Sequence, residues 1–204
     1  MAGDQLKRFD RWRHRLPERT KYLADLVIDQ IVPVFREQGF DRFPDYAGGS
    51  AFAVGMNCIP LQRRSGPEWP TVEFLFDKRC RPTFGVTFAM LPEVCSRQTE
   101  HGPKDIPRVE ANVVEGRAYF LLCKGQRSNF DCSFGYRGFV LRPKSRLDGE
   151  IAVLRSLLPG LFSILETGIP ETWYGKRPGY IDQYAFLSPG SRISRSPGEL
   201  EPKA

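Results

Sequence analysis

The stretch VEFLFDKRCRPTFGVTF, residues 72–88, decides the fold of this chain. Apolar residues occupy every second position on both sides of its charged centre, first at 72, 74 and 76 and then at 84, 86 and 88. Alternation with a period of two is typical of β-strands that bury one face. The charged segment between them, DKRCRP, has the length and composition of a hairpin connection. We therefore predict two antiparallel strands joined by a short turn.

Three further segments are predicted to add strands to this hairpin. They are AFAVGMNCIPLQRR (51–64), RAYFLLC (117–123) and the long aromatic stretch FDCSFGYRGFVL (130–141). Short connections between successive strands favour an antiparallel sheet over a parallel one. Residues 92–116 have weak periodicity and are predicted to form a long loop with a short helical turn.

Two amphipathic helices flank the predicted strands. The first begins at Pro17 and ends at Gly39, and Pro33 predicts a kink or break inside it. The second follows a capping arrangement at Ser145, and Pro159 predicts a bend or division there. Each helix must bury an apolar stripe, and the sheet offers the available apolar face. The fold class is therefore α+β, with a mainly antiparallel sheet of four to six strands packed against an N-terminal and a C-terminal helix in a two-layer sandwich.

The chain of 204 residues has the length of one domain with extensions. We expect a basic amphipathic leader over 1–16, a single α+β domain over 17–187 and a disordered tail over 188–204. No run of about 18 apolar residues is present to span a membrane, and the N-terminal stretch lacks the apolar region of a secretory signal. The five cysteines are odd in number and show no close pairs, which predicts reduced thiols and a cytoplasmic location.

The positive charge is concentrated at the N-terminus. Residues 1–21 hold seven basic and three acidic side chains, so they contribute +4 of the net charge of +6. Leu6, Phe9, Trp12 and Leu16 form one apolar stripe on a short helix, which favours a leader packed onto the domain. The alternative is an arm that contacts nucleic acid or a membrane surface.

Cys80 is the candidate nucleophile, because its positively charged neighbours favour the thiolate. His101 is the candidate base, although no spacing in the sequence requires the two to meet. The competing interpretation is that Cys80 lies in the charged turn of a hairpin. Glu73 and Asp77 could serve in acid–base chemistry, but alternating strand polarity explains them more simply. The cysteine and histidine spacings fit no metal site, and no phosphate-binding loop is present, so no metal or cofactor is expected.

The segment ETWYGKRPGYIDQYAF, residues 171–186, combines aromatic and basic side chains. Such residues dominate binding hot spots and also stack on nucleobases, which favours a recognition surface. The alternative is that the segment crosses the sheet and buries its rings against the core. Two charged segments, at 61–65 and 78–81, supply further candidate contacts. The candidate binding residues are Trp173, Tyr174, Lys176, Arg177, Tyr180, Arg63, Arg64, Lys78, Arg79 and Arg81.

The segments FREQGF, LQRRS, FGVTFAMLP and YFLLC with FGYRGFVL together resemble a bacterial family of small cytoplasmic α+β domains of unknown function. The resemblance covers about residues 22–165. It implies the fold described above and supplies no catalytic residues. By analogy with bacterial domains of this size, we expect a non-enzymatic binding or protein-interaction domain of the immunity or adaptor kind. The alternatives are a thiol-dependent enzyme using Cys80 with His101 and a nucleic-acid-binding protein using the basic leader.

Overall fold

The computed structural model describes residues 4–42, 57–111, 113–124, 132–138, 140–167, 173–174 and 184–186. The predicted hairpin is confirmed. Strand β3 (Glu68–Phe76) pairs antiparallel with β4 (Thr83–Pro92), and Phe74 lies opposite Val86 in the register. The apolar residues of the alternating pattern, Val72, Phe74, Phe76, Phe84, Val86 and Phe88, are all buried in the main core.

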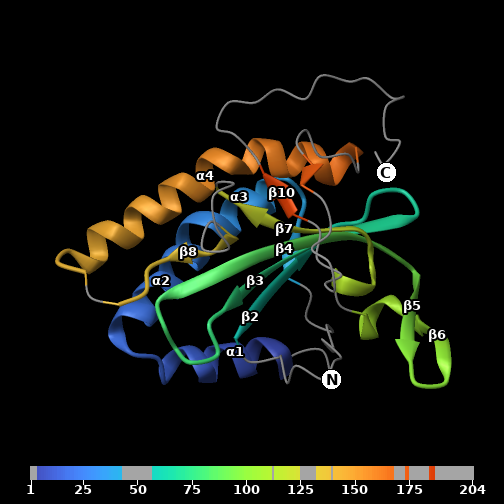
Figure 1. Ribbon diagram of the computed structural model, residues 1–204, viewed down its shortest axis with the longest axis horizontal. Helices are drawn as coiled ribbons and strands as arrows, with labels where there is room; N and C mark the ends of the chain where they lie inside the picture. The colour runs from blue at the N-terminus through green and yellow to red at the C-terminus, as the bar shows by residue number, and fades with distance from the viewer. Residues whose placement is uncertain are drawn as a thin grey trace.

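The hairpin forms the centre of an eight-stranded sheet (Figure 1). Its order is β1 (Asp41–Arg42), β2 (Cys58–Gln62), β3, β4, β7 (Arg117–Cys123), β10 (Tyr184–Phe186) and β9 (Trp173–Tyr174), and β8 (Phe134–Gly135) pairs with β4. Only β10 runs parallel to its neighbour β7, and the other pairs are antiparallel. Four of the eight strands are two or three residues long. The α+β fold with a mainly antiparallel sheet is confirmed.

Helices pack on the sheet through the predicted stripes. The N-terminal helical segment consists of α2 (Glu18–Leu26), a π-helical turn (Val27–Ile31) and α3 (Val32–Glu37). The π-helical turn ends at Ile31, so Pro33 is the second residue of α3 and falls in its first turn, where its missing N–H costs no hydrogen bond. Gly39 then adopts a φ of +78°, and the N–H of Phe40 donates to the carbonyl of Phe35 at 3.0 Å, which closes the helix end.

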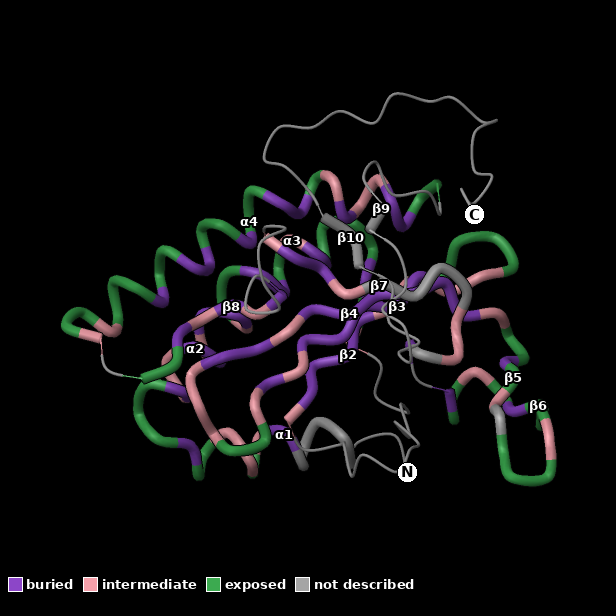
Figure 2. The backbone as a smooth tube through the Cα atoms, viewed as in Figure 1, coloured by how far each residue is buried: buried purple, intermediate pink, exposed green. Residues whose placement is uncertain are grey.

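The second helix, α4 (Pro143–Thr167), differs from the prediction in two respects. It begins at Pro143, so Ser145 lies inside the first turn and does not cap the helix. It also continues through Pro159 as one helix of 25 residues. Leu154, Leu158 and Leu161 are among the residues that it buries against the core, and in Figure 2 the buried positions recur along the length of this helix.

The leader packs onto the domain. Helix α1 (Asp4–His14) buries Phe9, whose ring lies 5.9 Å from that of Phe76, and Trp12 packs against the same ring at 5.7 Å. Leu16 also joins the main core. The predicted tail over 188–204 lies outside the described residues. No helix in the described part of the chain is both long and apolar enough to cross a membrane.

Two predictions are wrong, one for a connection and one for a strand. Residues 92–116 hold a second, two-stranded sheet of β5 (Val94–Thr99) and β6 (Gly102–Pro107), followed by short 3-10 turns at Arg108–Glu110 and Val113–Glu115. Conversely, the predicted long strand over 130–141 is reduced to the two residues of β8 in its described part. Gly135 and Gly138 have φ values of +112° and +83°, which L-amino acids in a strand do not adopt.

Candidate functional site

The candidate nucleophile Cys80 lies in the turn between β3 and β4. Its φ is +57°, the left-handed conformation, and its carbonyl accepts a hydrogen bond from the Thr20 hydroxyl at 2.6 Å. Arg81 binds Asp77 through its guanidinium, and the N–H of Arg79 donates to the same carboxylate at 2.7 Å. Burial opposes ionisation of Asp77, but these hydrogen bonds hold its pKa below the ordinary value. The contacts of this segment are those of a structural turn.

The structure does not bring His101 to Cys80. His101 lies in the turn between β5 and β6, which follows the far end of β4, whereas Cys80 precedes the near end of the same strand. Ten residues of extended chain separate the two ends of β4, which corresponds to roughly 30 Å. Figure 1 shows the β5–β6 hairpin and the β3–β4 turn at opposite ends of the molecule. This geometry gives the Cys80 thiol no base from His101.

The candidate binding residues are divided in the same way. Arg63 stacks on Phe40 at 4.9 Å and donates to the carbonyl of Gln38 at 3.0 Å, so it ties β2 to the end of α3. Arg64 lies near the ring of Trp69, at the start of β3. The turn with Lys78, Arg79 and Arg81 follows the opposite end of β3. These two groups therefore do not form one surface.

The aromatic segment is only partly described. Trp173 and Tyr174 form β9, the edge strand beside β10, and their side chains lie outside the described part of the structure. Lys176, Arg177 and Tyr180 lie outside the described residues altogether.

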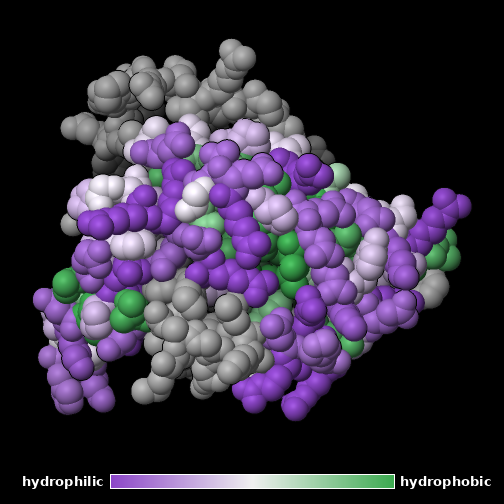
Figure 3. All heavy atoms as spheres, turned by 180° about the vertical axis from the view of Figure 1, so that it is seen from behind, coloured by the Kyte–Doolittle hydropathy of each residue, from purple (hydrophilic) through white to green (hydrophobic). Residues whose placement is uncertain are grey.

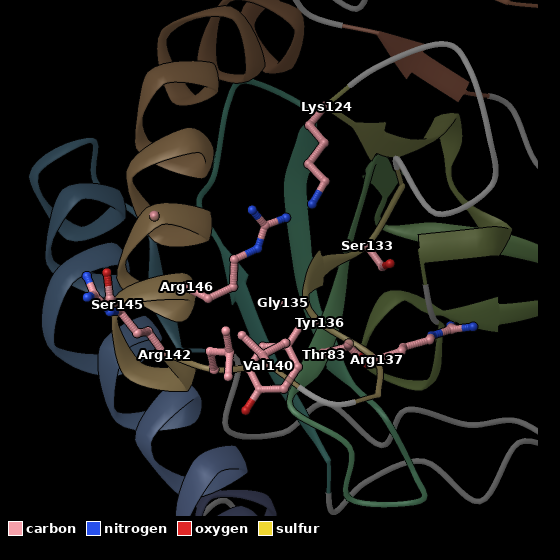
Figure 4. Close-up of a pocket in the computed structure, with 12 residues that line it drawn as sticks. Thr83, Lys124, Ser133, Gly135, Tyr136, Arg137, Val140, Arg142, Ser145 and Arg146 are labelled. Atoms are coloured by element: carbon pink, nitrogen blue, oxygen red, sulfur yellow. The ribbon is translucent and has the colours of Figure 1, made fainter.

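The sequence pattern did not reveal an open pocket of about 1300 Å³ between β8, the end of β7 and the first turns of α4 (Figure 4). Four basic residues line it: Lys124, Arg137, Arg142 and Arg146. Lys124 follows β7 directly, and Arg146 projects from α4. Figure 4 shows these two side chains pointing toward one another across the pocket, with Arg137 directed away at its margin.

The carboxylate of Glu150 organises the two converging cations. Glu150 is buried, with 5% of its surface exposed, and lies one turn after Arg146 on α4. It binds the Lys124 ammonium through Oε2 and the Arg146 guanidinium through Oε1, the latter at 2.9 Å. The N–H of Gly135 also lies 3.4 Å from Oε2. One buried carboxylate thus fixes both cations and the backbone of β8.

The charged side chains in the described lining of the pocket are all basic, and the Glu150 carboxylate contacts two of them. Neutral hydroxyl groups of Thr83, Ser133, Ser145 and Tyr136 complete the polar part of the lining. Val140 and Leu141 supply an apolar part, and Leu141 is 87% exposed at the margin. In addition, the positive end of the α4 backbone dipole lies at this pocket. The arrangement suits an anionic group better than a cation or a purely apolar ligand.

A disulfide bond lies directly beside the pocket. Cys123, the last residue of β7, is bonded to Cys132, two residues before β8. The prediction of five reduced thiols is therefore wrong for this pair. The physical reason is the sheet topology, because β7 and β8 both pair with the same side of β4. Leu121 of β7 lies opposite Thr87, and Phe134 of β8 lies opposite Phe84. The end of β7 and the start of β8 therefore lie close together, and each carries one of the two cysteines nearby. The other three cysteines, Cys58, Cys80 and Cys95, are free.

Glu73 is a second buried carboxylate. It lies on the face of the sheet opposite to Val72 and Phe74, which belong to the main core. The 3-10 turn Val113–Glu115 packs over this face, and only 3% of Glu73 is exposed. The N–H of Val113 and the hydroxyl of Thr87 lie 3.4 and 3.3 Å from its oxygens. Burial raises the pKa of Glu73 from about 4.5 to about 7, and the nearby Glu115 adds to the rise.

In the described ranges, no group of three or more histidine, cysteine, aspartate or glutamate side chains could hold a metal ion. Seen from behind, the described surface is mainly hydrophilic, with smaller hydrophobic areas (Figure 3). Comparison of the chain with protein-family models, with curated proteins and with solved structures finds no match. The interpretation of the site therefore depends on its own geometry.

Proposed function

We propose that this chain is a binding protein whose pocket between β7, β8 and α4 receives an anionic group, phosphate or carboxylate, carried by a segment of a partner protein. An adaptor or an immunity protein would use such a site. The observation that carries the proposal is the excess of cations around an open pocket, with Lys124 and Arg146 held in place by Glu150. Preorganised cations bind anions more tightly than mobile ones, because less conformational entropy is lost on binding.

The size of the pocket supports a macromolecular partner. Its volume of about 1300 Å³ exceeds the range of roughly 300–1000 Å³ that encloses most small ligands, and it is open to solvent. The exposed Leu141 beside Val140 would give an apolar side chain of the partner a contact next to the anionic group. A peptide segment with alternating acidic and apolar residues meets both requirements.

Cytoplasmic location, expected from the cysteine usage, stays a prediction. In that compartment the Cys123–Cys132 bond would be exposed to cellular reductants, since disulfides there are generally transient. The aromatic segment over 171–186 also stays a candidate contact surface for the same partner.

The proposal is tested by fluorescence polarisation with a fluorescein-labelled acidic peptide that contains phosphoserine. Arg146→Gln and Lys124→Gln are each expected to weaken binding roughly tenfold, the effect of losing one charge-assisted hydrogen bond. Arg155→Gln is the matched control, because Arg155 lies exposed on the same helix outside the pocket lining. Binding should also weaken as salt is added.

Equal affinities for wild type and both pocket variants would contradict the proposal. Binding of a single-stranded oligothymidine that survives Arg146→Gln, but falls when the leader arginines are replaced, would favour the nucleic-acid alternative instead.

A further inference from the structure

The disulfide joins the ends of two strands that supply the pocket. Cys123 and Cys132 are each followed directly by a lining residue, Lys124 and Ser133 respectively. Both cysteines are buried, Cys123 completely and Cys132 to all but 7% of its surface. The bond therefore fixes the backbone from which the Lys124 ammonium reaches Glu150.

We propose that the oxidation state of the Cys123–Cys132 pair controls anion binding at this pocket, an inference that builds on the proposed function. With the bond formed, the end of β7 and the start of β8 are held together, and Lys124 stays fixed against Glu150. With the bond reduced, non-covalent contacts hold these segments beside each other, among them the short β8 pairing, the Glu150 contacts and the Lys124 ammonium over the Phe134 ring. The pocket then loses preorganisation, and the affinity for an anion falls.

The reduction requires a dithiol as reductant. A thiolate of the dithiol attacks Sγ of Cys132, the less buried of the two residues; the S–S bond breaks, and Cys123 leaves as a thiolate that takes up a proton. The second thiol of the reductant then displaces Cys132, which also becomes a thiol. Two electrons and two protons pass from the dithiol to the cysteine pair, and the reductant becomes a disulfide.

Two of the three free cysteines do not compete for this exchange within the fold. Cys58 and Cys95 are buried, and burial raises the pKa of both thiols, which keeps them in the unreactive protonated form. Cys80, the third free cysteine, lies in the turn between β3 and β4 and is the one tested separately below.

The experiment compares the full chain in oxidised form and after reduction with dithiothreitol. The labelled phosphoserine peptide is expected to bind roughly tenfold more weakly to the reduced protein. The Cys123→Ser variant should bind like the reduced protein and lose its response to the reductant. Cys80→Ser is the matched control, since it keeps the disulfide and should keep the full response.

A second measurement does not depend on the peptide. The N–H of Gly135 donates to Glu150, so its hydrogen exchange reports the same network. We expect faster exchange at Gly135 in the reduced protein and no change at Leu158 in α4. If neither form binds the peptide but Gly135 still responds, the proposed function fails and so does redox control of anion binding, whereas the coupling between the disulfide and the Glu150 network stands. Unchanged exchange at Gly135 overturns the redox proposal, as does alkylation of five free thiols in the unreduced protein.

Folding is monitored by circular dichroism. If Cys123→Ser does not fold, the oxidised and reduced forms of the wild type supply the comparison by themselves.

Discussion

Replacement of Glu73 by glutamine should change how the stability of the protein depends on pH. In the folded protein the carboxyl is buried and its pKa is about 7, whereas in the unfolded chain it returns to about 4.5. Between these values the folded state holds one proton more than the unfolded state. The free energy of unfolding therefore falls as the pH rises from about 4.5 through about 7, and stays lower above that range.

The size of the effect follows from the shift. A difference of about 2.5 units, at 1.36 kcal/mol per unit, corresponds to about 3 kcal/mol. Glutamine has nearly the same shape: its carbonyl oxygen can accept from the N–H of Val113, its amide NH2 can donate to the hydroxyl oxygen of Thr87, and it does not ionise. The advantage of Glu73→Gln over the wild type should thus grow by about 3 kcal/mol between pH 4.5 and pH 8.

Urea denaturation of both proteins at several pH values measures this difference. Titrations of other groups are common to both proteins and cancel in the comparison. Glu37→Gln, at an exposed position near the end of α3, is the control and should follow the wild type at every pH. A constant difference between Glu73→Gln and the wild type across this range would refute the reasoning.

Three further substitutions have expected outcomes. Gly135→Ala should cost more than about 3 kcal/mol or prevent folding, because its φ is +112° and a Cβ would lie 2.1 Å from the carbonyl oxygen of Pro82; thermal unfolding measures this loss. Gly149→Ala, inside α4 with nothing within 4 Å of the added Cβ, should instead raise the stability by about 0.5–1 kcal/mol in the same assay. Glu150→Gln should lower the melting temperature, because two cations lose their anionic partner, and should weaken binding of the phosphoserine peptide, because Lys124 and Arg146 are no longer held in place. Equal or stronger peptide binding by the folded variant would show that Glu150 does not preorganise the two cations.

The sequence predicts the elements whose signal is local. The alternation of Val72, Phe74 and Phe76 and the stripes of the two helices depend only on neighbouring positions, and the structure confirms them. The β5–β6 hairpin gives no such signal, because β6 is largely exposed and buries Ile106 alone among its described side chains. Without a buried face, a strand shows no alternation.

The site depends on contacts that no local pattern records. Lys124 and Arg146 meet only because β7 ends beside α4, and Cys123 meets Cys132 only because two strands share one side of β4. One signal was present: residues 142–146 read RPKSR, a basic run that coincides with the start of a helix. A basic run at a helix start combines side-chain charge with the backbone dipole. This run therefore indicates an anion-binding position, and three of its residues line the pocket.

The π-helical turn Val27–Ile31 limits which insertions and deletions the N-terminal helical segment can tolerate. A π-helical turn holds one residue more than the α-helical turn it replaces, so it rotates everything after it by about 100° around the helix axis. In the helix with this turn, the Phe35 ring lies 5.5 Å from the Phe74 ring of β3. Deleting a single residue between 27 and 31 would straighten the helix, carry Phe35 away from Phe74 and move Pro33 back among hydrogen-bonded positions. Sequences that share this fold should therefore keep the extra residue and the proline together, or lose both.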